Sequence, residues 1–285
     1  MLRVASIAFL NPAPLLYDFE HGPRAAELRS RYAVHYTSPA QCAAELISGD
    51  ADLGLIPIAA LTPELAIVPG CTIASRGEIR SILLLVKNPQ GLDAKAAMRQ
   101  VKRFAADAAS RSSQAYVHIL FRHFLGIQPE VQEAAADAIT MLNGNDAALL
   151  IGDPALLARE HRTQIDASAG TSLLWLDVAA WWREYTGLPW VAAVWAVRPE
   201  KLGEVSREQV IADVNASRVA GLAHVEDLVA EWTPRLALPV ETIRTYLTKN
   251  IYYALDDDCI ASIGRFRDLA TAIGLLPPMP TLRML

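Results

Sequence analysis

Short apolar runs alternate with helical patterns along the first part of the chain, and this alternation limits the folds open to it. Arg3–Phe9, Tyr32–Thr37 and Leu53–Ile56 have the apolar pattern of strands. Between them, Pro12–Phe19 carries an early proline, and Ser38-Pro39 supplies an N-cap and a first-turn proline for the next helix. This β-α-β-α-β order predicts an α/β fold with a parallel sheet and right-handed crossovers.

A second α/β unit follows in the middle of the chain. Strands are expected at Val101–Ala106, Glu130–Ala134 and Ala147–Ile151, with a helix over Ser112–Leu125. After this unit, Val191–Val197 forms a continuous apolar strand, and the remainder of the chain has helical patterns.

Two breaks rich in turn-forming residues, near Asn88 and near Pro189, bracket the second unit. A chain that leaves one lobe, builds another and returns crosses between them twice. We therefore predict that residues 1–87 form the first part of lobe 1 and residues 88–190 form lobe 2. Residues 191–285 complete lobe 1 with a return strand and C-terminal helices. A ligand is expected at the carboxyl ends of the strands, between the two lobes.

Composition excludes several classes of protein. The chain has 285 residues, of which 52% are hydrophobic and 20% charged, so it can build a core. A net charge of −5 gives no basic field for a nucleic acid, and no long uncharged apolar window predicts a membrane span. The first residues lack the pattern of a signal peptide, which favours a cytoplasmic protein. The oligomeric state stays open.

Metal-ligand spacing is absent from the sequence. Cys42, Cys71 and Cys259 are widely separated, and the six histidines show neither HxH nor HExxH spacing. We therefore expect no metal site.

Two segments place polar side chains where a strand gives way to a helix. Asn11 follows the first strand, and it is either an ordinary helix N-cap or a group that can both donate to and accept from a ligand. The run Ser110-Arg111-Ser112-Ser113 opens a helix with three hydroxyls, one guanidinium and free N–H groups. This run suits a carboxylate or phosphate, and its alternative is a well-capped helix with a surface arginine.

A third polar segment, residues 74–81, lies between two apolar strands. It contains Ser75, Arg76, Gly77 and Ser81, and turn-forming residues of this kind are typical of a hairpin-like connection. A site at this position is the alternative. Gly152-Asp153-Pro154, which follows another strand, is interpreted as a helix cap.

These motifs together resemble the MqnA/MqnD family of menaquinone biosynthesis. The resemblance rests on five segments in order: Ser6–Asn11, Gly49–Pro57, Ser110–Ser113, Leu150–Asp153 and Tyr185–Trp195. The Leu-Asn pair near the start and the Thr-Gly-Leu-Pro run are similar to the chorismate dehydratase branch.

The resemblance implies a two-lobed fold like the type 2 periplasmic binding proteins and a cofactor-free hydro-lyase. This enzyme dehydrates chorismate to 3-[(1-carboxyvinyl)oxy]benzoate, which opens the futalosine route to menaquinone. Asn11 and Ser81 are then expected to face the reacting ring, with Ser75, Arg76 and Gly77 on the same wall. The residues that would bind a substrate carboxylate from the second lobe are Ser110, Arg111, Ser112 and Ser113.

The sequence departs from the family pattern at two places. Gly77-Glu78-Ile79 stands where the family usually has Gly-Pro-Val, and Ile58 follows Pro57 where a serine or threonine is frequent. Glu78 is the one candidate base inside the matched motifs, and it stands at a departure. We therefore hypothesise that the substrate's own enolpyruvyl carboxylate removes the proton. The alternatives are a dihydroxynaphthoate synthase of the same pathway and a solute-binding protein for a small carboxylate.

Overall fold

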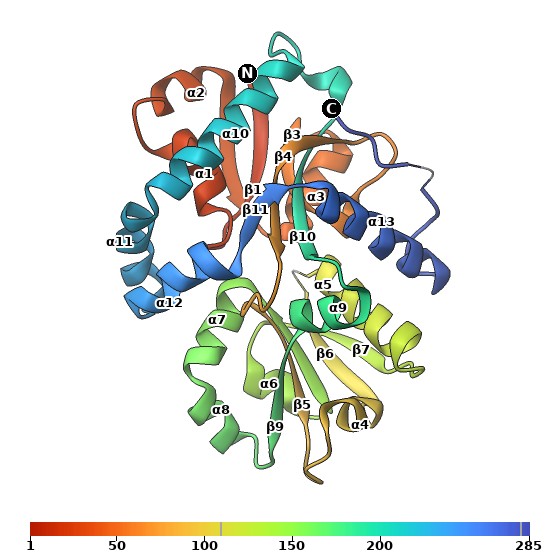
Figure 1. Cartoon of the computed structure of the whole chain (residues 1–285). Coiled ribbons are helices and arrows are strands. Elements are labelled where there is room, and N and C mark those ends of the chain that lie inside the picture. Colours follow the sequence, from red (N-terminus) through yellow and green to blue (C-terminus); the bar gives the residue numbers. More distant parts are fainter. Residues whose placement is uncertain (109, 280) are drawn as a thin grey trace.

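The computed structural model describes residues 1–108, 110–279 and 281–285, and its strands form two sheets (Figure 1). The first sheet has six strands in the order β11-β4-β10-β3-β1-β2. Its strands are β1 (Leu2–Ile7), β2 (Tyr32–Thr37), β3 (Leu53–Pro57), β4 (Ala66–Ser75), β10 (Trp190–Val197) and β11 (Tyr252–Leu255).

The second sheet has five strands in the order β7-β6-β8-β5-β9 and forms the core of the lower lobe in Figure 1. Its strands are β5 (Ile82–Lys87), β6 (Arg103–Asp107), β7 (Glu130–Ala134), β8 (Ala147–Ile151) and β9 (Leu173–Asp177). The strands predicted at residues 130–134 and 147–151 are confirmed.

Pairing in the first sheet confirms the predicted parallel arrangement of its first three strands. β1 pairs in parallel with β2 and with β3, and the helices between them provide the crossovers. These helices are α1 (Ala13–Glu20), α2 (Ala25–Arg31) and α3 (Pro39–Ser48). Ser38 caps α3 as predicted, because its hydroxyl accepts a hydrogen bond from the Gln41 N–H at 3.2 Å. β10 returns antiparallel between β3 and β4.

The other helices pack around the two sheets (Figure 1). In lobe 2 they are α4 (Ala94–Arg99), α5 (Ser112–Ile119), α6 (Ala138–Leu142), α7 (Gly152–Glu160), α8 (Arg162–Ser168) and α9 (Val178–Thr186). In the C-terminal part they are α10 (Arg207–Ala223), α11 (Val225–Leu236), α12 (Val240–Thr245) and α13 (Asp257–Ala272). None of the helices in the part of the chain that the structure describes is long and apolar enough to cross a bilayer.

The first crossing between the lobes lies earlier than the predicted boundary near Asn88. β5 pairs with β8 and β9, so residues 82–87 belong to lobe 2, and the chain crosses through residues 76–81. Asn88 lies in a turn after β5. The predicted boundary is wrong because turn-forming residues mark a reversal of the chain, which here lies within lobe 2. The interpretation of residues 74–81 as a hairpin-like turn is also wrong, because β4 and β5, which flank this segment, belong to different sheets.

The crossing segment is held by a carboxylate from lobe 2. Asp177, at the end of β9, accepts the backbone N–H groups of Ile79 at 3.3 Å and Arg80 at 2.7 Å. Arg80 has a φ of 67°, a left-handed conformation that costs energy for a side chain with a Cβ. Asp177 thus stabilises a strained residue of the crossing segment, and burial raises the pKa of the Asp177 carboxyl group.

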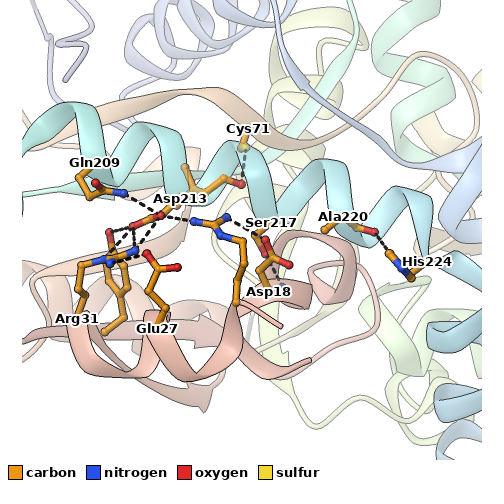
Figure 2. A network of polar contacts seen from close by, with 12 residues as sticks. Asp18, Glu27, Arg31, Cys71, Gln209, Asp213, Ser217, Ala220 and His224 are labelled. Carbon is orange, nitrogen blue, oxygen red and sulfur yellow. Dashed lines mark hydrogen bonds and ion pairs between the residues drawn. The ribbon is translucent and has the colours of Figure 1, made fainter. Parts of the chain in front are cut away.

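A buried polar network fastens α10 to the edge of the first sheet (Figure 2). Asp213 is fully buried and accepts hydrogen bonds from Arg24 at 2.6 Å, Arg31 at 3.0 Å and the Tyr32 hydroxyl at 2.9 Å. Two guanidinium groups around one carboxylate keep a buried charge paired. The network joins elements that are distant in the chain, since Arg24 and Asp213 are 189 positions apart.

Candidate functional site

A cavity lies between the lobes, at the carboxyl ends of strands β1, β3 and β8. Its enclosed volume is about 50 Å³, and the wider hollow that opens to solvent measures about 440 Å³. Apolar side chains form most of its wall: Ile7, Phe9, Pro39, Pro57, Ile73, Ile82, Ile151, Trp190, Ala192 and Ala193. The remaining lining residues are Asn11, Ser110, Arg111, Ser112, Ser113 and Gly152. The cavity lies where the sequence predicted a ligand.

Asn11 lines this cavity and is not a helix cap. The N-cap of α1 is Pro12, and no side chain caps that helix. Asn11 is 9% exposed, and its Oδ1 atom has no hydrogen-bond partner among the described residues. A buried amide oxygen without a partner costs free energy unless a ligand or water meets it. The N-cap interpretation of Asn11 is therefore wrong.

Two more buried polar atoms at the cavity lack a partner in the described part of the chain. They are the Ser110 hydroxyl and the Trp190 indole nitrogen, whose residues are 4% and 0% exposed. The residues that line this one cavity thus include an acceptor, a hydroxyl and a donor N–H that lack partners in the described part of the chain. An arrangement of this kind is typical of a site completed by a polar ligand.

The N-terminus of α5 provides the positive side of the cavity. Arg111 occupies the N-cap position, and Ser112 and Ser113 form the first turn. Arg111 is exposed, and among the described residues its guanidinium makes no ion pair or hydrogen bond. A free guanidinium beside the first N–H groups of a helix favours an anion. The structure thus brings the four predicted residues 110–113 together at one wall.

Ser112 also joins the two lobes. Its hydroxyl accepts the backbone N–H of Ala59, in the short 3₁₀ turn after β3, at 3.2 Å. The Ser112 hydroxyl therefore binds the neighbouring lobe and does not cap its own helix. The alternative of a well-capped helix with a surface arginine is wrong for the cap, although Arg111 is exposed. This hydrogen bond between the lobes helps to hold the N-terminal end of α5 in place.

Ser81 lies behind the cavity and does not line it. It is fully buried, and its hydroxyl accepts a hydrogen bond from the Tyr246 hydroxyl at 2.8 Å. Burial raises the pKa of Tyr246, and contacts with Ser81 and Asn11 offset part of the rise. Ser81, Tyr246 and Asn11 therefore form one buried polar group next to the cavity, contributed by the crossing segment, the turn after α12 and the loop after β1.

The other predicted residues of the crossing segment lie outside the cavity wall. The Ser75 hydroxyl bonds the backbone of Gly77 at 3.1 and 3.2 Å, which closes a local turn. Arg76 is exposed, and it pairs with Asp256 and Asp258 at the start of α13. The structure does not bring these three residues to the cavity with Asn11.

Gly152 and Asp153 of lobe 2 lie against the loop after β1 in lobe 1. Gly152 has a φ of +61°, and a Cβ placed there would lie 2.7 Å from the ring of Phe9. Asp153 is 8% exposed, and its two carboxylate oxygens lie 3.0 and 3.2 Å from the backbone N–H of Leu10. The N-cap of α7 is Ile151, so the interpretation of Asp153 as a helix cap is wrong. Burial raises the pKa of Asp153 to about 6, and the hydrogen bond from Leu10 partly opposes this rise.

The cavity wall offers few groups for acid–base or metal chemistry. None of its described lining residues is a histidine, aspartate, glutamate, lysine or cysteine. Across the described ranges 1–108, 110–279 and 281–285, no group of three histidine, cysteine, aspartate or glutamate side chains could hold a metal ion. Reaction in this cavity would therefore depend on orientation, hydrogen bonding and groups of the ligand itself.

Sequence reasoning missed the roles of Trp190 and Tyr246 at the site. Trp190 stands beside the second break, where a tryptophan next to a run of apolar residues indicates packing and gives no local sign of a ligand. Tyr246 carries no local motif, and the residue that it bonds is 165 positions away. Only the fold brings these side chains to the cavity.

Comparison with known proteins identifies the family of the chain. A family model described as menaquinone biosynthesis matches residues 2–272. The chain belongs to this family. A Thermus thermophilus protein named chorismate dehydratase is 25% identical over 278 residues, which cover 94% of this chain and 93% of that protein.

Solved structures show the same fold at low sequence identity. An Archaeoglobus fulgidus protein has a TM-score of 0.68 at 18% identity, covering 96% of this chain and 98% of its own. The periplasmic aliphatic sulphonate binding protein of Escherichia coli has a TM-score of 0.66 at 17% identity, covering 97% and 94%. The predicted periplasmic-binding-protein fold is therefore confirmed.

Proposed function

We propose that this protein is a chorismate dehydratase, which converts chorismate to 3-[(1-carboxyvinyl)oxy]benzoate and water as the first step of the futalosine pathway. Membership of the menaquinone biosynthesis family and the Thermus relative support the proposal. The observation that carries it is the buried amide of Asn11, which lacks a partner for its oxygen and faces a cavity that Arg111 lines from the other lobe.

Chorismate fits the chemistry of the cavity. It is a dianion with a cyclohexadiene ring, so it needs cationic or N–H donors for its carboxylates and apolar walls along the ring. Arg111 and the first turn of α5 supply the donors, and Phe9, Ile151 and Trp190 supply apolar and aromatic surface. Charge-assisted contacts to a carboxylate are the strongest hydrogen bonds available here.

The reaction itself requires little from the protein, because the product is aromatic. The enolpyruvyl carboxylate of the substrate takes the proton from C3, and the C–H electron pair becomes the new ring double bond. The C4–O bond breaks, and the departing hydroxyl group leaves as water when it takes up the proton that the enolpyruvyl carboxylate has removed from C3. In this proposal the Asn11 amide N–H donates to the departing oxygen. The closed lobes exclude bulk water and hold the substrate carboxylate near C3.

Ser81 enters the proposal as a positioning group next to Asn11. Its hydroxyl accepts from Tyr246, and its carbonyl oxygen accepts the Gly152 N–H at 2.8 Å. These two bonds connect the crossing segment with both lobes. Ser81 thereby fixes the position of the crossing segment next to the cavity in which the ring of chorismate would bind.

Incubation of the purified protein with chorismate, followed by mass spectrometry, tests the proposal. The expected product is lighter than chorismate by one water molecule and is not formed by protein that has been heat-denatured. Calorimetry on the same sample measures binding of chorismate. Tight binding without any product would contradict the dehydratase and favour a solute-binding protein of the same fold.

A further inference from the structure

The contact between Asp153 and Leu10 joins the two lobes directly beside Asn11. Asp153 lies in the first turn of α7 in lobe 2, and Leu10 lies in the loop between β1 and α1 in lobe 1. The two carboxylate oxygens lie 3.0 and 3.2 Å from the Leu10 N–H, and both residues are buried. Leu10 immediately precedes Asn11, so a contact that fixes the Leu10 backbone also restricts the position of Asn11.

The residues around this contact explain why the carboxylate turns toward the other lobe. α7 has no side-chain cap among the described residues, so Asp153 makes no capping hydrogen bond to its own helix. Gly152 lets the backbone approach Phe9 so closely that even a methyl group would collide with the ring. The close approach brings the carboxylate within reach of the Leu10 N–H, which would otherwise be a buried donor without an acceptor.

We propose that Asp153 is a positioning residue for the reaction: it holds the Leu10–Asn11 backbone of lobe 1 against lobe 2 and so places the Asn11 amide in the closed cavity. This inference rests on the proposed function, because it assigns Asn11 to the substrate. Asp153 itself does not line the cavity, and its effect passes through Leu10. Site assembly is thereby coupled to closure of the lobes.

Two substitutions separate positioning from simple stability. Asp153→Ala removes the acceptor, whereas Asp153→Asn keeps an amide oxygen that can accept the Leu10 N–H. We expect Asp153→Ala to lower kcat about 10- to 100-fold with a smaller change in KM, the range for loss of a hydrogen bond to a charged acceptor. Asp153→Asn should restore kcat to near the value of the unsubstituted protein.

Asp137→Ala is the matched control. Asp137 is also an aspartate of lobe 2, and it caps α6 by accepting the Thr140 N–H at 2.7 Å. It lies outside the cavity wall, so its loss should lower the melting temperature and leave kcat and KM unchanged. A fall in kcat for Asp137→Ala equal to that for Asp153→Ala would show a general effect of lost stability and overturn the positioning role.

Hydrogen exchange of the Leu10 amide tests the contact without any turnover. We expect the peptide that contains Leu10 to exchange about 10- to 100-fold faster in Asp153→Ala than in the unsubstituted protein, and to stay protected in Asp153→Asn. Unchanged protection in Asp153→Ala would overturn the inference even in a fully active enzyme. Absence of dehydration by the unsubstituted protein, with the exchange pattern as expected, would instead contradict the proposed function alone.

Discussion

Replacing Asp153 with asparagine should stabilise the protein above about pH 6 and leave its stability nearly unchanged near pH 4. Burial raises the pKa of Asp153 to about 6 in the folded protein, whereas an aspartate in the unfolded chain has a pKa of about 3.9. The folded state therefore holds the proton more tightly than the unfolded state. The stability contributed by the neutral carboxyl group is fully present below about pH 4 and is lost as the pH rises to about 6.

The size of the effect follows from the difference between the two pKa values. About two pKa units correspond to about 3 kcal/mol of unfolding free energy, and local relaxation makes this an upper value. An asparagine stays neutral at every pH and still offers an oxygen to the Leu10 N–H. The variant should thus gain up to about 3 kcal/mol over the unsubstituted protein above pH 6, and the gain should shrink to nearly zero toward pH 4.

Urea unfolding at a series of pH values, followed by tryptophan fluorescence, measures this difference. Other ionisable groups on the surrounding elements, among them Asp177, Tyr246 and the Glu78–Arg159 ion pair, are present in both proteins and cancel in the comparison. A difference that does not change between about pH 4 and pH 8 would refute the reasoning. So would a variant that is less stable than the unsubstituted protein at pH 8.

Three further predictions concern the ligand, the fold and metal ions. Arg111→Ala should weaken chorismate binding about 10- to 150-fold in calorimetry, the value of a charge-assisted contact of about 1.5–3 kcal/mol, and unchanged affinity would place the carboxylate elsewhere. Asp213→Ala should cost about 3–5 kcal/mol in urea unfolding, because Arg24 and Arg31 lose their shared acceptor, while KM stays the same; a change in KM would contradict a purely structural network. Exhaustive chelation should leave turnover intact, and strict metal dependence would defeat the cofactor-free mechanism.

Local patterns in the sequence were sufficient for most of the secondary structure and for part of the site. The strand at residues 32–37 and the helix capped by Ser38 follow from signals within a few residues, and the structure confirms both. The run Ser110–Ser113 was recognisable because hydroxyls and a guanidinium stand together before a helix. Signals of this kind depend on neighbours in the chain.

Features that depend on distant parts of the chain could not be predicted. Turn-forming residues near Asn88 gave no information about which sheet β5 would join, since both sheets accept an apolar strand. β11 was absent from the prediction because Tyr252–Leu255 is short and pairs with β4 across most of the chain. The sequence also could not show that Asp153 would meet Leu10, 143 positions away, instead of capping its own helix.

The turnover number of Asn11→Asp with chorismate tests the central claim most directly. Asn11 is not a helix cap, so the variant should remain folded, with a melting temperature close to that of the unsubstituted protein. The proposed reaction loses its amide donor and gains an anion next to a dianionic substrate, and kcat should fall on the order of 100-fold. A folded Asn11→Asp protein that dehydrates chorismate at the rate of the unsubstituted protein would contradict the account.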